Sequence, residues 1–357
     1  MQKELDRRKR AILGIVVDEY IRIGDPVGSK LVQQKLESKG LSVSSATIRN
    51  DMAALEKLGY LEQPHTSAGR VPSYTGYRYY ISELMEPQQI TDEERDLIDQ
   101  MIGRDCCTAD AVIENAVSVL SDLTGLTAVN TGTLPQISVI TKIEVIPAGH
   151  RVYALLMITS LGSVKNRMCR LEFDVSPEQL DYFREFINEH LRGVNPDDLT
   201  PAAMQNLGLS LGAYMMALSP LLHAVYEMSE DLSAQYVHLT GEQKLLSNAQ
   251  IQTDQALRLI AQRNQLMQIL ENATGNISVL FGKEDGSFAV SNSSMIVSHF
   301  SVGGHQAGAF GVIGPLRIDY AKVIPYIGCI SDSVTRLLGE ISAQNMPHDG
   351  GMEQKNG

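Results

Sequence analysis

Residues 44–72 read SSATIRNDMAALEKLGYLEQPHTSAGRVP, and this stretch carries the strongest local signals in the chain. Ser44 is a good N-cap and Gly59 is a good stop signal, so a helix is predicted between them. Two short apolar segments then flank a polar turn at 64–69, which predicts a small hairpin. The stretch therefore predicts a helix that is followed directly by two short strands.

The outer face of this predicted helix carries small hydrogen-bonding side chains near its N-terminal end, with Arg and Asn beside them. These residues are Ser45, Thr47, Arg49 and Asn50. Arg reads guanine, Asn reads adenine, and Ser and Thr hold phosphates, so the pattern suits a recognition helix in the DNA major groove. An ordinary solvated helix face has a similar composition, and the helix alone leaves these two interpretations balanced.

Two further helices are predicted upstream. Apolar residues near helical spacing indicate an amphipathic helix over 7–22, and Gly24-Asp25-Pro26 ends it. Ser29 is the predicted cap of a short second helix that runs through Leu36. Three helices followed by a hairpin are the arrangement of a winged helix-turn-helix domain, and this context favours the DNA-binding interpretation.

The predicted hairpin tip adds three candidate contacts to the DNA backbone or minor groove, namely His65, Ser67 and Arg70. A turn histidine without a ligand explains His65 equally well. After the hairpin, four of the 13 tyrosines fall within 74–80. Aromatic rings near a basic segment can stack on bases, but a hinge helix that packs this head onto the rest of the chain is favoured, because tyrosines suit a half-buried seam.

The charge of the chain is unevenly distributed. The net charge is -12, which at face value argues against a nucleic-acid partner. Residues 1–80 hold 13 Lys and Arg against 9 Asp and Glu, a net charge of +4, so the remainder carries -16. A basic part on an acidic chain is a recognised indication of nucleic-acid contact by that part. We therefore expect the acidic body to be repelled from DNA and the head alone to bind.

Composition bounds the remaining classes. The 357 residues are 43% hydrophobic and 20% charged, which predicts two or three globular domains. No run of about 18 apolar residues predicts a membrane span, and the charged start does not resemble a signal peptide. Four cysteines form no disulfide framework, and the adjacent Cys106 and Cys107 fit packing better than a redox pair. A reduced, cytoplasmic protein is expected.

The rest of the chain alternates between helical and β patterns. Helices are predicted over 92–124, strands over 137–146, 152–159 and 164–173, helices over 176–272, strands over 277–281, 287–290, 295–300 and 307–313, and a final helix over 323–341. Antiparallel strands before a terminal amphipathic helix fit the end of a GAF-like sensor fold. The helical block between the two β regions looks inserted, and its broad apolar faces make it a candidate dimerisation surface.

Enzymatic function is not expected. The glycines between 303 and 314 are not followed by a helix N-terminus with a Lys, so they do not form a phosphate-binding loop. The eight histidines are scattered without the spacing of metal ligands, and no acid–base pair stands out. No catalytic residue, cofactor or metal is therefore predicted.

Taken together, these motifs resemble the HrcA family of bacterial heat-inducible transcription repressors. The resemblance rests on GDPVGSK at 24–30, SSATIRNDM at 44–52, GYL at 59–61, QPHTSAGRVP at 63–72, GYRYY at 76–80 and GAFGVIGPLRIDY at 308–320. Two single positions and one three-residue link depart from the usual pattern of the family. Leu316 and Ile318 stand where it usually has Thr and Met, and Ser73-Tyr74-Thr75 replaces a link that contains Thr and Asp.

The pattern and the resemblance give an α+β multidomain fold. It combines an N-terminal winged helix-turn-helix, a GAF-like α/β sensor domain and an inserted, mostly helical dimerisation domain. The expected boundaries are 1–80 for the DNA-binding domain, 81–91 for a hinge, 92–175 and 275–343 for the two parts of the GAF-like domain, 176–274 for the insertion and 344–357 for a disordered tail.

The resemblance also implies the function. A family member represses chaperone operons by binding the inverted repeat called CIRCE in double-stranded DNA, and a two-fold operator implies a homodimer. The resemblance further implies the chaperonin GroEL as a partner that keeps the repressor active until heat stress diverts it. Two alternatives remain at this point. One is a sensor whose GAF-like domain binds a small molecule near Phe281, Phe300 and His305, and the other is a helical adaptor without DNA contact.

Overall fold

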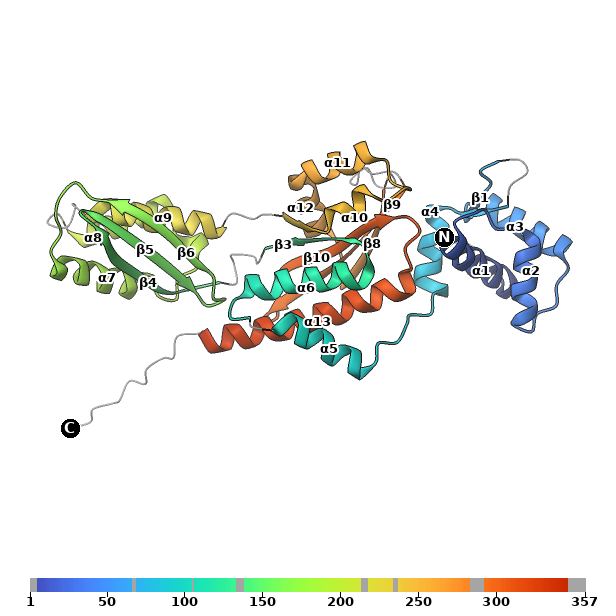
Figure 1. Ribbon diagram of the computed structural model, residues 1–357, viewed down its shortest axis with the longest axis horizontal. Coiled ribbons are helices and arrows are strands. Elements are labelled where there is room, and N and C mark those ends of the chain that lie inside the picture. The colour runs from blue at the N-terminus through green and yellow to red at the C-terminus, as the bar shows by residue number, and fades with distance from the viewer. Residues whose placement is uncertain are drawn as a thin grey trace.

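The computed structural model describes residues 5–65, 69–104, 106–132, 138–212, 218–233, 237–282 and 292–345. Three units follow one another along its long axis (Figure 1). We call them the head (5–72), the body (92–131 with 237–345) and the lobe (138–233), and a hinge helix over 74–84 joins the head to the body. Within the described ranges, no helix is both long and apolar enough to cross a bilayer.

The head contains three helices and a two-stranded hairpin, as predicted. Its elements are α1 (Arg7–Ile23), α2 (Ser29–Ser38), α3 (Ser45–Lys57), β1 (Leu61–Glu62) and β2 (Val71–Pro72). Ser44 caps α3 by accepting a hydrogen bond from the Thr47 N–H, which confirms its predicted role. Ser29 was the wrong cap for α2, because Gly28 holds the extended N-cap position and Ser29 is already the first helical residue.

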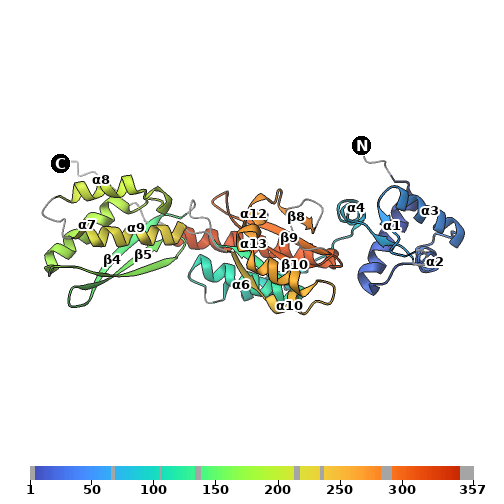
Figure 2. The same ribbon diagram turned by 90° about the horizontal axis from the view of Figure 1, so that it is seen from above.

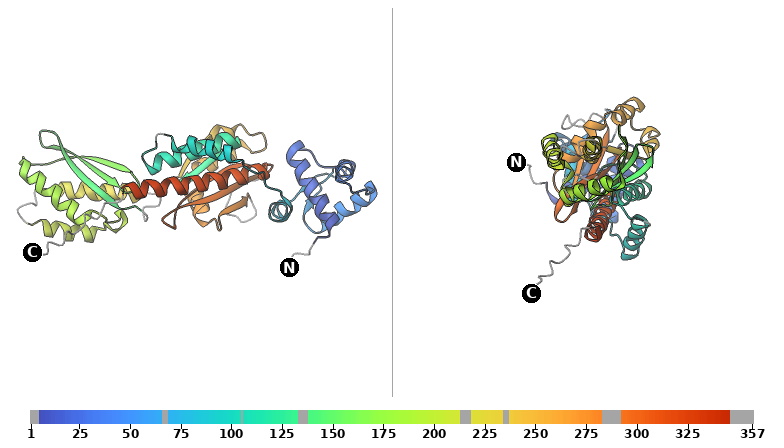
Figure 3. Two further views of the ribbon diagram at one scale, coloured as in Figure 1. Left: turned by 90° about the horizontal axis from the view of Figure 1, so that it is seen from below. Right: turned by 90° about the vertical axis from the view of Figure 1, so that its left-hand side faces the viewer.

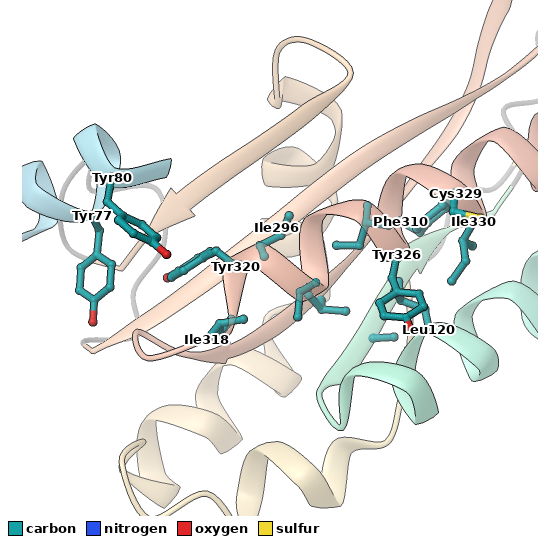
Figure 4. Packing of buried hydrophobic residues seen from close by; sticks show 14 of the residues in the cluster. Tyr77, Tyr80, Leu120, Ile296, Phe310, Ile318, Tyr320, Tyr326, Cys329 and Ile330 are labelled. Atoms are coloured by element: carbon teal, nitrogen blue, oxygen red, sulfur yellow. The ribbon is translucent and has the colours of Figure 1, made fainter. Parts of the chain in front are cut away.

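The hinge helix follows at once, as α4 (Tyr74–Tyr79) and the π-helical turn η1 (Tyr80–Leu84). Ser73 caps it by accepting from the Gly76 N–H. Its tyrosines pack between the head and the body, so the prediction of a packing seam is confirmed (Figure 4).

The body is a five-stranded antiparallel sheet between two helical layers. Its strands, in the order β7-β3-β10-β9-β8, are β7 (Val237–Thr240), β3 (Thr127–Thr131), β10 (His305–Pro315), β9 (Ser293–Val302) and β8 (Ile277–Phe281). One layer consists of α5 (Asp92–Gly103), α6 (Ala109–Thr124) and α13 (Tyr320–Asn345), and the other of α10 (Glu242–Leu246), α11 (Thr253–Ala261) and α12 (Arg263–Asn272) (Figures 1 and 2).

Both faces of the central strands are therefore buried. Along β9, Ile296 and Phe300 pack with the cluster around α6 and α13, whereas Met295 and Val297 pack with the cluster around α12. A strand that is covered on both faces has a continuous apolar sequence, which explains why β9 and β10 show little alternation. Helix α13 runs along this sheet beside α6 (Figure 3).

The lobe has a separate sheet and a separate core. Its elements are β4 (Ile140–Gly149), β5 (Val152–Thr159), β6 (Val164–Arg170), α7 (Pro177–Leu191), the 3-10 turn η3 (Pro196–Asp198), α8 (Pro201–Leu211) and α9 (Ser219–Ser233). One face of β5, including Leu155 and Met157, packs with Phe183 of α7 and Val225 of α9.

The observed units differ from the predicted boundaries. The strands predicted over 137–173 were assigned to the GAF-like domain, but they form the lobe sheet with α7–α9. The segment 237–272 was assigned to the insertion, but it supplies β7 and one helical layer of the body. The strand predicted over 287–290 lies outside the described residues, as does the chain after Asn345.

The lobe nevertheless is an insertion. The chain leaves the body after Thr131 of β3 and returns at Val237 of β7, and these two residues are direct partners in the antiparallel pair. The two ends of the lobe therefore meet at one edge of the body sheet. An insertion with adjacent ends leaves the pairing of its host sheet undisturbed.

Candidate nucleic-acid interface

The start of α3 is held by hydroxyl groups. Ser45 Oγ lies 2.9 Å from Ser29 Oγ, which joins the first turns of α2 and α3. Thr47 Oγ1 lies 2.9 Å from Ser44 Oγ, beside the capping hydrogen bond. Two of the predicted DNA contacts, Ser45 and Thr47, are thus half-buried and already have partners within the head. These two hydroxyl contacts fix the start of α3 relative to α2 and to the Ser44 cap.

The next outward positions of α3 are occupied by Arg49 and Asn50, both exposed. Among the described residues, neither side chain makes a hydrogen bond or an ion pair, so their donors face solvent. Exposed Lys30 and Lys57 add positive charge on α2 and at the end of α3. This part of α3 has the side-chain chemistry that binding to base edges requires.

An ion pair on the opposite side of α3 escaped the sequence prediction. Arg8 of α1 donates from Nε to Asp51 Oδ2 at 2.6 Å and from Nη2 to Oδ1 at 3.2 Å, and Asp51 is buried. A two-pronged arginine–carboxylate pair fixes both distance and angle between two helices. The sequence did contain a signal for this pair, because an acidic residue lies among the apolar positions of α3 and the N-terminal run is basic.

A second buried carboxylate, Glu19, joins α1 to α2. It accepts hydrogen bonds from Arg22 on its own helix and pairs with Lys35 Nζ of α2 at 2.5 Å. Burial alone raises the pKa of Glu19, but the hydrogen bonds from Arg22 and Lys35 outweigh it, so the pKa lies below its ordinary value. The three helices of the head are therefore locked by charged pairs as well as by apolar packing.

The hairpin residues have different environments. Arg70 has a side chain only 16% exposed and pairs with Glu56 of α3, through Nη2 at 2.8 Å and Nε at 3.0 Å. Its backbone also exchanges two hydrogen bonds of 2.9 Å with Val27. Arg70 thus joins the hairpin to α3 and to the α1–α2 loop. His65 is exposed at the tip, and Ser67 lies outside the described residues.

Gly69 explains how the hairpin approaches so closely. A Cβ at this position would lie 2.3 Å from the Val27 carbonyl oxygen, well inside van der Waals contact. Only glycine allows the hairpin backbone to pair with the α1–α2 loop here.

The head meets the body through aromatic rings. Tyr77 of α4 is fully buried, with its ring centroid 6.0 Å from that of Phe281 and 5.8 Å from that of Tyr320 (Figure 4). The guanidinium of Arg317 lies 5.8 Å from the ring centroid of Tyr20 on α1. Burial raises the pKa of Tyr77 far above its ordinary value, so its hydroxyl stays protonated. We call this contact the aromatic seam.

The proposed small-molecule pocket is not assembled. Phe281 belongs to the aromatic seam, Phe300 is buried against Phe310 with centroids 5.9 Å apart, and His305 is exposed at the β9–β10 turn. Phe281 pairs in register with Ser294 and Phe300 with Gly308, so the two rings stand at different levels of the sheet. The structure does not bring these three side chains together, and the small-molecule alternative is not favoured.

Two cavities are formed by described residues of the body, the hinge and the head. An open cavity of about 880 Å³ lies between α5, α6 and α13, and is lined by Leu97, Met101 and Arg336 among others. A smaller one of about 310 Å³ lies between α1 and the hinge helix, beside Arg10 and Tyr80. In the described part of the chain, no group of His, Cys, Asp and Glu side chains has the geometry of a metal site.

A helical head with an outward-facing Arg and Asn, carried by a hinge on a larger body, is typical of the class of transcription regulators. Comparison with known proteins gives the family. The protein-family model described as "HrcA protein C terminal domain" matches residues 110–324 of this chain. The chain belongs to the HrcA family of heat-inducible transcription repressors. This is not a class of enzymes.

Relatives match almost the whole chain. The "Heat-inducible transcription repressor HrcA" of Symbiobacterium thermophilum is 32% identical, over 93% of this chain and 98% of the relative. That of Halalkalibacterium halodurans is 30% identical, over 96% of this chain and 100% of the relative. A crystal structure described as that of a hypothetical protein shares the fold, with a TM-score of 0.68 at 22% identity, over 95% of this chain and 100% of the other.

Proposed function

We propose that this repressor acts as a homodimer whose two heads bind the two halves of an inverted-repeat operator in double-stranded DNA. The observation that carries the proposal is the pair Arg49 and Asn50, exposed on α3 while Ser45, Asp51 and Glu56 hold the helix from its other sides. A rigid helix with free Arg and Asn donors is what direct readout in the major groove needs.

Within this proposal the head is a winged helix-turn-helix. Arg49 and Asn50 bind base edges, Ser45 and Thr47 bind phosphates at the helix start, and His65 and Ser67 on the hairpin contact the backbone or minor groove. Arg70 takes a different role from the one predicted. Its pairing with Glu56 and Val27 supports a positioning role for the hairpin over direct contact with DNA.

The dimer contact is proposed on the lobe. Helices α7–α9 cover one face of its sheet, and large apolar side chains are exposed on the opposite face. Ile146, Val164 and Met168 there are 46%, 51% and 59% exposed. Exposed apolar patches of this kind are typical of interaction sites, and a two-fold dimer pairs such a patch with its own copy.

The body, with its antiparallel sheet and terminal helix α13, is proposed to be GAF-like and to carry the heads rather than bind a ligand. The inverted repeat CIRCE as operator and the chaperonin GroEL as partner are proposed on the resemblance of the sequence motifs. A repressor has to reach the chromosome, so the cytoplasm is its proposed location.

The test compares two duplexes at one fixed salt concentration, one with the complete inverted repeat and one with a single half. The expected dimer binds the complete repeat about a hundredfold or more tightly, because the second head binds at high effective concentration. Raising the salt concentration should weaken both complexes. Equal affinity for the two duplexes, with a single protomer in sedimentation, would reject the dimeric mode of binding.

A further inference from the structure

One turn of the lobe, residues 160–163 between β5 and β6, packs against the body. The Leu161 carbonyl accepts a hydrogen bond from the Ala109 N–H at 2.9 Å, and Ser163 Oγ donates to Asp110 Oδ2 at 3.2 Å. The Leu161 side chain is fully buried within the apolar cluster that contains α6 and α13, although the core of the lobe forms a different cluster. Figure 1 shows this end of the lobe beside the start of α6.

The turn is built to fit this position. Gly162 has φ +76, and a Cβ on it would lie 2.8 Å from the Cys107 carbonyl oxygen. Ala109 is the first residue of α6, whose N–H has no partner inside the helix, and the Leu161 carbonyl satisfies it. The lobe therefore caps a helix of the body with its own backbone.

This contact determines how the lobe is oriented. The chain crosses between body and lobe twice, and both crossings start from the paired residues Thr131 and Val237. Two neighbouring attachment points on one sheet edge define an axis and do not by themselves fix rotation about it. A third contact on a different element, α6, fixes the rotation about this axis.

We infer that residues 160–163 form a latch that sets the orientation of the lobe and, through it, the separation and relative rotation of the two heads. Leu161 and Gly162 are then positioning residues that determine which half-site spacing the dimer accepts. The inference rests on the proposed dimer through the lobe. Half-sites of a two-fold operator must present the same face of the DNA to both heads, so a fixed lobe selects one spacing.

The experiment uses full-length protein and a series of inverted repeats whose spacer is lengthened or shortened by up to about 5 base pairs, half a helical turn. The test variants are Leu161→Ser, which removes the apolar contact, and Gly162→Val, whose side chain overlaps the Cys107 carbonyl. Leu209→Ser, on an exposed lobe residue outside the latch, is the matched control.

Wild type and the control should show a sharp affinity maximum at one spacing. Both latch variants should remain dimers, lose about tenfold in affinity at that spacing, and vary less than about threefold across the series. Hydrogen exchange at the Ala109 amide should accelerate in both, which reports that the latch has opened. An accelerated Ala109 amide together with an unchanged spacing profile would overturn the inference.

Failure of the proposed dimer gives a different result. Wild-type protein that sediments as a monomer would contradict the dimer itself, whatever the spacing profile. The orientation role of the latch is then measured by small-angle scattering. A changed curve for the latch variants, with an unchanged one for Leu209→Ser, supports the latch, and identical curves for all four proteins overturn it.

Discussion

The head and the lobe are attached to the body in different ways. At the aromatic seam, Tyr77 is fully buried between Phe281 and Tyr320, and the apolar core of the head continues into that of the body. The lobe has its own core, and the latch ties it to the body through Leu161. The head is thus fixed by shared packing, whereas the lobe has its own sheet and its own core.

A buried, unpaired hydroxyl lies in the aromatic seam, and another lies beside the latch. Among the described residues, Tyr77 Oη and Thr159 Oγ1, the latter next to the latch, have no hydrogen-bond partner. Burying such a group costs about 1–3 kcal/mol. The aromatic seam is therefore weaker than its apolar packing alone indicates, and the Tyr77 hydroxyl becomes hydrated when the seam opens.

The largest expected effect comes from removing the lobe. Replacing residues 133–236 by a short flexible linker should leave the head and body folded, because β3 and β7 remain paired. The product should be monomeric and should lose about a hundredfold or more in affinity for the complete inverted repeat, since the second head no longer binds at high effective concentration. Sedimentation and DNA titration measure this. A persisting dimer would move the interface to the head or body.

Substitutions in the aromatic seam should strongly change the free energy of unfolding. Tyr77→Ala removes a fully buried ring and should lower the free energy of unfolding by about 3–5 kcal/mol. Tyr77→Phe keeps the ring and removes the unpaired hydroxyl, so it should be neutral or stabilising. Chemical denaturation of the two variants distinguishes them. A Tyr77→Phe protein as unstable as Tyr77→Ala would show that the hydroxyl has a partner.

The contribution of Arg49 to binding should be independent of the lobe. Arg49→Ala should weaken operator binding by about 1–3 kcal/mol if the guanidinium reads a base. The loss should be the same on a single half-site in the protein without the lobe as in the full chain. Lys142→Ala, an exposed lobe residue, is the control. Unchanged affinity of Arg49→Ala at fixed salt removes this residue from the interface.

A smaller effect is expected in acid, where the ion pairs of Glu19 make the stability of the head depend on pH. The pKa of Glu19 lies below its ordinary value of 4.5, so its ion pairs stabilise the head fully above that pH. This stabilisation is lost as the pH falls through the folded-state pKa. The Glu19→Gln variant should therefore show a flatter dependence of unfolding free energy on pH below 4.5. An unchanged slope would mean that other carboxylates control the acid response.

Local signals in the sequence predicted the head well. The Ser44 cap, the stop at Gly59 and the hinge tyrosines all depend on residues close together in the chain. The division between body and lobe was not predictable in the same way. Strand β5 alternates between buried and half-buried positions, and this pattern is the same whichever helical layer covers it.

In the candidate site, too, contacts between residues far apart in the sequence could not be predicted from local signals. Arg70 was predicted as a DNA contact from its place on the hairpin, and nothing in the local sequence reveals that Glu56, 14 positions earlier, lies beside it. Ser45 similarly finds Ser29 across a helix–helix contact. Exposure of Arg49 and Asn50, by contrast, follows from helical periodicity around the buried Ile48 and Met52.

The pairing of Thr131 with Val237 has a consequence for engineering. The body has two adjacent strand ends, at which another domain with neighbouring termini can be inserted in place of the lobe. Under the proposed dimer contact through the lobe, exchanging the lobe for a domain that dimerises only in the presence of a drug would make the repressor respond to the drug concentration, with the head left unaltered.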